Sequence, residues 1–172
     1  MNRPTFALAL LAITCGSAAL PAYVLAGPVE DVQTAMQLLK SKAAALGVPS
    51  VKGEETVAGK SVPGLYFGEV EMDNNFTLVD EVQQKMGGTA TLFVKSGDEF
   101  VRIATNVKKD DGSRAIGTVL DPKGKAIVAI AKDESYFGEV TILGKPYIAG
   151  YEPVHDGNHN VIGVYYVGYP KM

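Results

Sequence analysis

An arginine lies at the centre of the stretch Glu99 to Val107, whose apolar and β-branched composition predicts a β-strand. Side chains alternate between the two faces of a strand, so one face would carry Phe100, Arg102, Ala104 and Asn106. A buried guanidinium needs an anion, because an unpaired charge away from water costs much free energy. If the anion is a ligand carboxylate, the guanidinium holds it through two parallel hydrogen bonds. The alternatives are a side chain that reaches water from an edge strand, and an ion pair with Asp80, Glu99 or Glu139.

Side chains from other segments would complete a small polar cavity suited to an organic acid. On the stretch Lys145 to Val154, alternation places Lys145, Tyr147, Ala149 and Tyr151 together. Arg114 follows an Asp-Gly turn, where it would either cover the cavity or pair with Asp110 or Asp111 at the surface. For the tyrosines, the alternative is that they cover the edge of the core with the hydroxyl in water. The predicted ligand-binding residues are Arg102, Asn106, Arg114, Tyr136, Lys145, Tyr147 and Tyr151.

No familiar catalytic or metal-binding pattern is found in the sequence. His155, Asp156 and His159 fall in a six-residue polar segment with the composition of a solvated turn. The single cysteine, Cys15, excludes an intrachain disulfide and a cysteine-based metal site. Nucleophile elbows, phosphate-cradling loops and dinucleotide fingerprints are all missing from the sequence. We therefore expect a protein that is not an enzyme, with no metal and no cofactor.

Helices are predicted in three places. Apolar residues at three- and four-residue steps predict an amphipathic helix from Val29 to Leu46. Its apolar stripe would pack on a sheet or form the seam of a homodimer. The range Phe76 to Met86 predicts a second helix, with Asn75 as its cap and Gly87 as its stop, and Lys123 to Lys132 predicts a third.

The remaining elements are strands. Val51 to Val62 predicts a loop or an exposed hairpin, and Leu65 to Val70 a strand. Five further strands are predicted at Thr89 to Lys95, Glu99 to Val107, Tyr136 to Leu143, Lys145 to Val154 and Val161 to Tyr169. Strands in series with helices before and between them indicate an α+β domain with a five- to six-stranded antiparallel sheet.

The first 26 residues predict a signal peptide rather than part of the fold. A basic start is followed by the apolar run Phe6 to Ile13, and small residues precede a cleavage site after Ala26. The alternative is an uncleaved membrane anchor over Phe6 to Leu25. We expect residues 27–172 to form one periplasmic or secreted domain. With 16 basic and 19 acidic residues, the chain does not have the basic excess of a nucleic-acid-binding protein.

A run of short motifs in the second half of the chain carries a family resemblance. The motifs are Phe100-Val101-Arg102, Asp111-Gly112-Ser113-Arg114-Ala115, Ser135-Tyr136-Phe137-Gly138, Gly144-Lys145-Pro146-Tyr147, Gly150-Tyr151-Glu152-Pro153 and Tyr166-Val167-Gly168. In this order they resemble the single Cache domain found in the sensor regions of methyl-accepting chemotaxis proteins and sensor histidine kinases.

The resemblance implies a PAS-like fold, with a long N-terminal helix on one side of an antiparallel sheet and a small-molecule pocket on the other. It also implies extracytoplasmic sensing or chemotaxis-type signal transduction, in which the domain binds a small organic anion. Because the chain ends just after the last predicted strand, the signal would pass through a partner such as a membrane receptor or histidine kinase. The alternatives are a structural interaction module without a ligand and, less favoured, a periplasmic enzyme.

Overall fold

The structure, a computed structural model, describes residues 28–171. The predicted signal peptide and its cleavage site after Ala26 lie outside the described residues. The elements follow in the order α1 (Pro28–Leu46), β1 (Pro49–Val57), β2 (Lys60–Phe67), β3 (Val70–Glu71), α2 (Thr77–Met86), β4 (Thr89–Ser96), β5 (Glu99–Thr105), α3 (Lys125–Ile130), β6 (Tyr136–Ile142), β7 (Lys145–His155) and β8 (Val161–Pro170).

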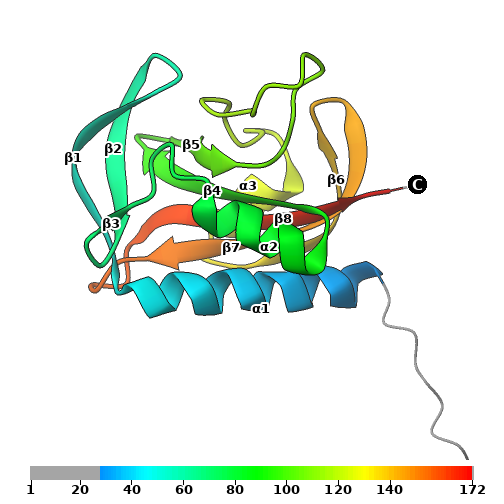
Figure 1. The fold of residues 1–172 in the computed structure, drawn as a ribbon, viewed down its shortest axis with the longest axis horizontal. Coiled ribbons are helices and arrows are strands. Elements are labelled where there is room, and N and C mark those ends of the chain that lie inside the picture. The colour runs from blue at the N-terminus through cyan, green and yellow to red at the C-terminus, as the bar shows by residue number, and fades with distance from the viewer. Residues whose placement is uncertain (1–27, 172) are drawn as a thin grey trace, which may run out of the picture.

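Two antiparallel sheets form the domain (Figure 1). The larger has the strand order β5-β4-β8-β7-β6, and the smaller has the order β1-β2-β3. Helix α1 runs along one side of the larger sheet and contacts β7 and β8. The C-terminal end of β8 lies on the same side of the domain as the N-terminal end of α1 (Figure 1). The predicted α+β class, with a long helix on a five-stranded antiparallel sheet, is confirmed.

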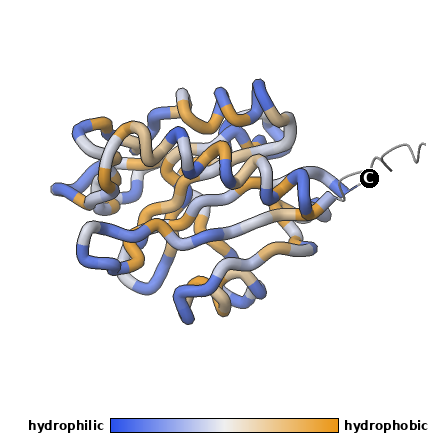
Figure 2. The backbone as a smooth tube through the Cα atoms, turned by 90° about the horizontal axis from the view of Figure 1, so that it is seen from below, coloured by the Kyte–Doolittle hydropathy of each residue, from blue (hydrophilic) through white to orange (hydrophobic). Residues whose placement is uncertain are grey.

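The apolar stripe of α1 is buried against the sheet. Pro28 begins the helix, where its lack of a backbone N–H costs nothing. Glu30 and Asp31 follow in the first turn, where the helix dipole favours negative charge. The side chains that face inward are Val32, Ala35, Met36, Leu39 and Ala43. Figure 2 shows how hydrophobic and hydrophilic residues alternate along the helices and strands. These five side chains of the stripe therefore pack on the sheet, whereas Val29 and Leu46 at its two ends are exposed. A homodimer through this helix stays a prediction.

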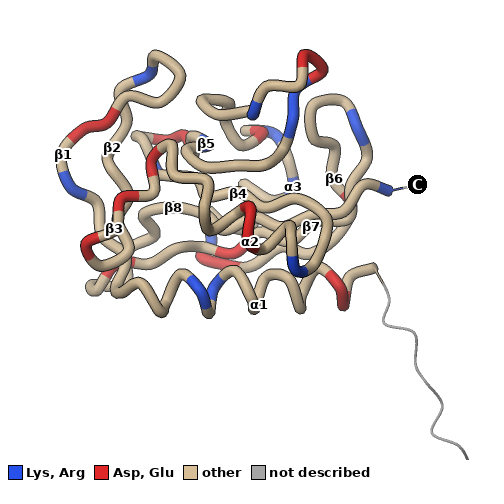
Figure 3. The backbone as a smooth tube through the Cα atoms, viewed as in Figure 1, with Lys and Arg blue, Asp and Glu red and all other residues tan. Residues whose placement is uncertain are grey.

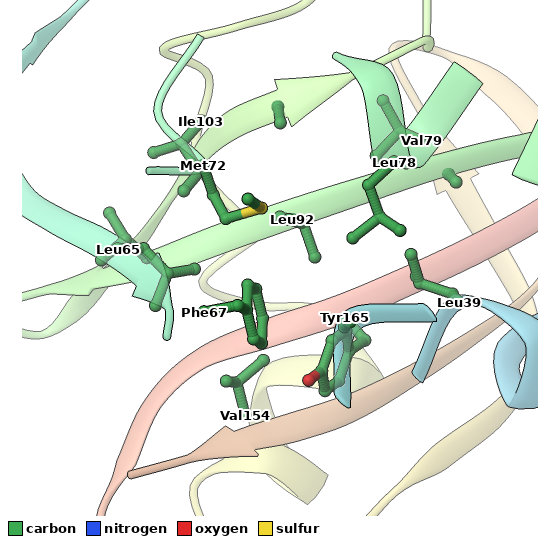
Figure 4. Close-up of a cluster of buried hydrophobic side chains, with 14 of the residues drawn as sticks. Leu39, Leu65, Phe67, Met72, Leu78, Val79, Leu92, Ile103, Val154 and Tyr165 are labelled. Atoms are coloured by element: carbon green, nitrogen blue, oxygen red, sulfur yellow. The ribbon is translucent and has the colours of Figure 1, made fainter. Parts of the chain in front are cut away.

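The larger sheet separates two hydrophobic clusters. The first lies between the sheet, the two long helices and the small sheet, and Figure 4 shows ten of its members labelled, among them Leu39, Phe67 and Tyr165. The second lies on the opposite face, where Phe93, Tyr147 and Tyr166 pack with residues of α3. The candidate site described below is on this second face.

Two glycines let α1 pass directly into the small sheet. Gly47 has a φ of 132°, and a Cβ on it would lie 2.6 Å from the Cα of Gly68. The amide of Gly68 donates to the carbonyl of Val48 at 3.0 Å. The backbones meet at a distance that no side chain permits, which fixes where the β1–β2 hairpin leaves the helix.

Several sequence-predicted boundaries differ from the structure. The region Val51 to Val62 is the exposed hairpin rather than the loop, and the strand expected to reach Val70 ends at Phe67, where a turn reverses it into β3. Helix α2 begins at Thr77 with Phe76 as its N-cap and without a side-chain cap hydrogen bond, so the prediction of Asn75 as the cap is wrong. Asn75 Oδ1 instead accepts the amide of Thr77 at 3.2 Å, in the turn just before the helix. Helix α3 is shorter than predicted because it covers only Lys125–Ile130.

Candidate ligand-binding site

A cavity of about 540 Å³ lies on the face of the larger sheet opposite α1. Arg102 of β5 and Tyr151 of β7 contribute from the sheet, the segment 118–126 forms one wall, and β6 with the turn that follows it forms the other. The volume is in the range of small-molecule sites. The cavity therefore has the size and the mixed polar and apolar lining that a metabolite needs.

Arg102 is the buried charge of this cavity. The residue is only 4% exposed, its guanidinium carbon lies 5.0 Å from the centroid of the Phe93 ring, and Nη1 donates to Thr118 Oγ1 at 2.5 Å. Its Nε is buried and has no hydrogen-bond partner in the part of the chain that the structure describes. The guanidinium is thus stacked on Phe93 and bonded to Thr118, while its Nε–H makes no hydrogen bond within residues 28–171.

The wall beside Arg102 is attached to β5 by backbone hydrogen bonds. Arg102 N–H donates to the carbonyl of Thr118, and Gly117 N–H donates to the carbonyl of Arg102, both at 2.8 Å. Leu120 N–H donates to the carbonyl of Phe100 at 2.9 Å. The segment 117–120 therefore continues the sheet beyond β5, and this places the hydroxyl of Thr118 next to the guanidinium.

No carboxylate neutralises Arg102 within residues 28–171. Asp80 pairs with Arg114, Glu139 pairs with Lys171, and Glu99 makes no ion pair among the described residues. Burial lowers the pKa of the Arg102 guanidinium, and the nearby phenols of Tyr166 and Tyr151 act in the opposite direction. Both sequence-based alternatives for this residue, an internal ion pair and a side chain in water, are therefore wrong.

Tyr151 adds a hydroxyl to the same space. Its ring packs 5.0 Å from that of Tyr166 at an interplanar angle of 50°, and the residue is 3% exposed. The hydroxyl has no hydrogen-bond partner among the described residues, whereas that of Tyr166 bonds Thr89 Oγ1 at 2.9 Å. Burial raises the pKa of the Tyr151 phenol, so this group stays protonated and able to donate.

The remaining charged residues of the lining favour an anion. Lys123 and Lys125 line the cavity and make no ion pair in residues 28–171, and both acidic lining residues are engaged. Asp121 Oδ1 accepts the amide of Lys123 at 2.9 Å, and Glu139 Oε1 lies 2.5 Å from Lys171 Nζ. Figure 3 shows the basic residues of the long segment between β5 and α3, above the sheet. With Arg102, the lining has three cations and two carboxylates, of which that of Glu139 is neutralised by an ion pair.

Asn106 does not share the cavity with Arg102, contrary to the expectation from alternation. Arg102 pairs with Phe93 and Ala104 with Leu92, so Ile103 is an extra residue in β5, a β-bulge. A bulge shifts the following residues to the other face. Asn106 Nδ2 consequently donates to the carbonyl of Val79 at 2.8 Å, and its Oδ1 accepts the amide of Ala90 at 2.7 Å.

The other sequence-predicted site residues divide between the second cluster and the surface. Of the seven, Arg102 and Tyr151 line the cavity. Tyr147 is buried in the second cluster, and Tyr136 packs on it while donating its hydroxyl proton to the carbonyl of Glu139 at 2.8 Å. Lys145 is exposed and pairs with Asp110 at 3.0 Å. Arg114 neither covers the cavity nor pairs with Asp110 or Asp111, because its partner is Asp80 at 2.7 Å.

Sequence reasoning missed the residues of the wall and the rim. Thr118, Asp121, Lys123 and Lys125 all come from the irregular segment before and at the start of α3. The signal available for them is the turn composition of Asp121-Pro122-Lys123-Gly124, which marks a loop but not which way it faces.

The described residues contain no group of three or more His, Cys, Asp or Glu side chains that could hold a metal ion. The turn after β7 is the solvated hairpin tip that was expected, closed by Asp156 Oδ1, which accepts the amides of Asn158 and Asn160 at 2.8 and 2.9 Å. Among the helices of residues 28–171, none has the length and apolar character needed to cross a bilayer.

The chain matches a protein-family model over almost all of its described residues. The family model described as the Cache 3/Cache 2 fusion domain covers residues 29–172. A search of curated proteins finds no match to the chain.

Proposed function

Since the chain belongs to the Cache 3/Cache 2 fusion domain family, whose members are extracytoplasmic ligand-binding sensors, we propose that it binds a small organic anion with Arg102 and signals through a partner. Cache domains usually sit in receptors. In this proposal the domain is exported by residues 1–26 to the periplasm, and its occupied form is recognised by a membrane receptor or a histidine kinase.

The observation that carries the proposal is the state of Arg102. Arg102 lines a cavity of about 540 Å³, its guanidinium has no carboxylate partner within residues 28–171, and its buried Nε makes no hydrogen bond there. Such a charge raises the free energy of the empty protein, and a ligand carboxylate relieves that cost. A carboxylate also matches the guanidinium fork better than any neutral group does. The Tyr151 hydroxyl supplies a further hydrogen-bond donor, and Lys123 and Lys125 supply further positive charge.

A thermal-shift screen tests the proposal. The protein is heated with formate, acetate, propionate, lactate or succinate, each beside its neutral amide. An acid at one hundred times its dissociation constant adds about 2.7 kcal/mol to the free energy of unfolding, whereas the amide adds nothing comparable. If no acid in the panel shifts the melting temperature, or if the amides shift it equally, the proposed anion site is wrong.

Two variants locate the binding. Arg102→Met removes the charge and keeps much of the side-chain length, so it should abolish the shift. Lys145→Met removes a cation that lies on the surface beside Asp110, outside the cavity lining, and should leave the shift unchanged. Equal losses in both variants would mean that general positive charge, and not the cavity, attracts the acid.

A further inference from the structure

Arg114 joins the long segment after β5 to helix α2. Its Nη1 and Nη2 donate to Oδ1 and Oδ2 of Asp80, each at 2.7 Å, and Nη1 also donates to the carbonyl of Thr105 at 2.8 Å. The guanidinium carbon lies 4.3 Å from the centroid of the Phe76 ring, at the start of α2. This is a two-pronged ion pair stacked on an aromatic ring, a geometry that lysine cannot reproduce.

The same segment continues directly into the cavity wall. Ala115 N–H donates to the carbonyl of Val107 at 3.0 Å, and Thr118 Oγ1 donates to the carbonyl of Ala115 at 2.7 Å. Thr118 in turn accepts from Arg102 Nη1 and bonds the Arg102 backbone. Thr118, which contacts the buried guanidinium, therefore lies only four positions after Arg114, which contacts α2.

We propose that Arg114 is a positioning residue of the cavity: its pair with Asp80 holds the wall 115–120 against β5 and so fixes the orientation of Arg102. The role in ligand binding rests on the proposed function. Release of Arg114 frees the wall, separates Thr118 from Arg102 and lets water reach the guanidinium. An anion on Arg102 favours the closed wall, and by reciprocity it favours the docking of α2 as well.

Hydrogen exchange without any ligand tests the positioning role. The amides of Arg102, Gly117 and Leu120 are the donors that bind the wall to β5. In Arg114→Lys we expect these three amides to exchange at least about tenfold faster, because lysine cannot form the two parallel hydrogen bonds to Asp80. The amides of the β7–β8 ladder serve as the internal reference and should keep their rates.

The matched control is Asp110→Asn. It breaks the exposed ion pair with Lys145 in the same segment and leaves Arg114 untouched, so the wall amides should exchange as in the unchanged protein. Asp80→Asn approaches the same pair from α2, keeps the shape of the side chain, and should reproduce the effect of Arg114→Lys if that variant fails to fold. Unchanged wall amides in both Arg114→Lys and Asp80→Asn, or equal acceleration of the β7–β8 ladder, would overturn the proposal.

Ligand binding gives a second readout. With the acid of the panel that shifts the melting temperature most, Arg114→Lys should raise the dissociation constant about tenfold and Asp110→Asn should not change it. If no acid binds the unchanged protein, the proposed function fails while the exchange rates still decide the role of Arg114. If an acid binds both variants equally, the link between Arg114 and the cavity is refuted although the anion site stands.

Discussion

Arg102 and Thr118 are joined twice, because Nη1 donates to Thr118 Oγ1 and the backbone amide of Arg102 donates to the Thr118 carbonyl at 2.8 Å. The Thr118 hydroxyl donates its own proton to the carbonyl of Ala115 at 2.7 Å, so it has no donor left for a ligand. The buried Nε of Arg102 has no partner in residues 28–171. An anion in the cavity must therefore take its hydrogen bonds from the guanidinium and not from the Thr118 hydroxyl.

The unpaired state of Arg102 predicts that removing its charge does not weaken the fold. Replacing a buried charge by an apolar side chain of similar volume is often neutral or stabilising. We expect Arg102→Met to change the free energy of unfolding in urea at pH 7 by less than about 1 kcal/mol or to increase it. The comparison is Arg114→Met, which leaves Asp80 without its two-pronged partner and should lose about 1–3 kcal/mol. A loss at Arg102 as large as that at Arg114 would show that Arg102 contributes to the fold instead.

Asp73 predicts an unusual dependence of stability on pH. It is 7% exposed, Oδ2 accepts the amide of Leu65 at 2.7 Å, and Oδ1 is buried without a partner in the described chain. Burial, with a smaller contribution from Glu71 and Glu55, raises the pKa of this carboxyl from 3.8 to about 6. The folded protein therefore binds the Asp73 proton more tightly than the unfolded chain does, and this contribution to stability is lost as the pH rises from about 4 to about 6.

Asp73→Asn isolates this effect from the other carboxylates. The amide oxygen still accepts from Leu65, and the charge that is costly at pH 7 is gone. We expect the variant to gain about 1–3 kcal/mol over the unchanged protein at pH 7 and almost nothing at pH 4, measured by urea unfolding across that range. A difference that is constant with pH would mean that the Asp73 carboxyl titrates normally in the folded state.

The two polar residues predicted to share a strand face, Arg102 and Asn106, show how far sequence reasoning reaches. Alternation places Phe100 and Arg102 on the same face as expected, and Val101 and Ile103 belong to the first cluster. The bulge at Ile103 breaks the alternation before Asn106. Whether a strand contains an extra residue depends on its pairing with β4, which is a long-range property that periodicity along one strand does not reveal.

The sequence did not predict the lining residues Thr118, Asp121, Lys123 and Lys125 for a related reason. The segment from Asn106 to Gly124 has no periodic pattern, and its place is set by contacts with residues distant in sequence, such as that between Arg114 and Asp80. Helices and strands with clear periodicity, by contrast, were placed within a few residues. The fold is therefore largely predictable from the sequence, but of the cavity lining the sequence indicates only Arg102 and Tyr151.

The position of Asn106 gives a third prediction, which separates a structural from a ligand-binding role. Asn106→Ala leaves the amide of Ala90 and the carbonyl of Val79 without partners in a buried place. Each unsatisfied group costs about 1–3 kcal/mol, so we expect a large loss in the free energy of unfolding. The dissociation constant of a bound acid, measured calorimetrically below the unfolding transition, should stay within about twofold of that of the unchanged protein. A tenfold weaker affinity in folded Asn106→Ala would show that Asn106 does contribute to ligand binding.

The rim lysines give the last prediction, which concerns the rate of binding rather than the affinity of the deep site. Lys123 and Lys125 line the cavity without ion pairs in residues 28–171, so their field attracts an anion before it reaches Arg102. Interactions of exposed charges act mainly on association and are screened within about 10 Å at 0.1 M salt. In the double variant Lys123→Gln, Lys125→Gln we expect the association rate constant of the acid to fall severalfold at low ionic strength, and the difference to vanish at about 0.5 M salt. The dissociation rate constant, followed by stopped-flow displacement, should not change.

Lys52→Gln, on the small sheet and outside this cavity, is the matched control and should leave both rate constants unaltered. A double variant that instead dissociates faster at every salt concentration would place the lysines in contact with the bound anion.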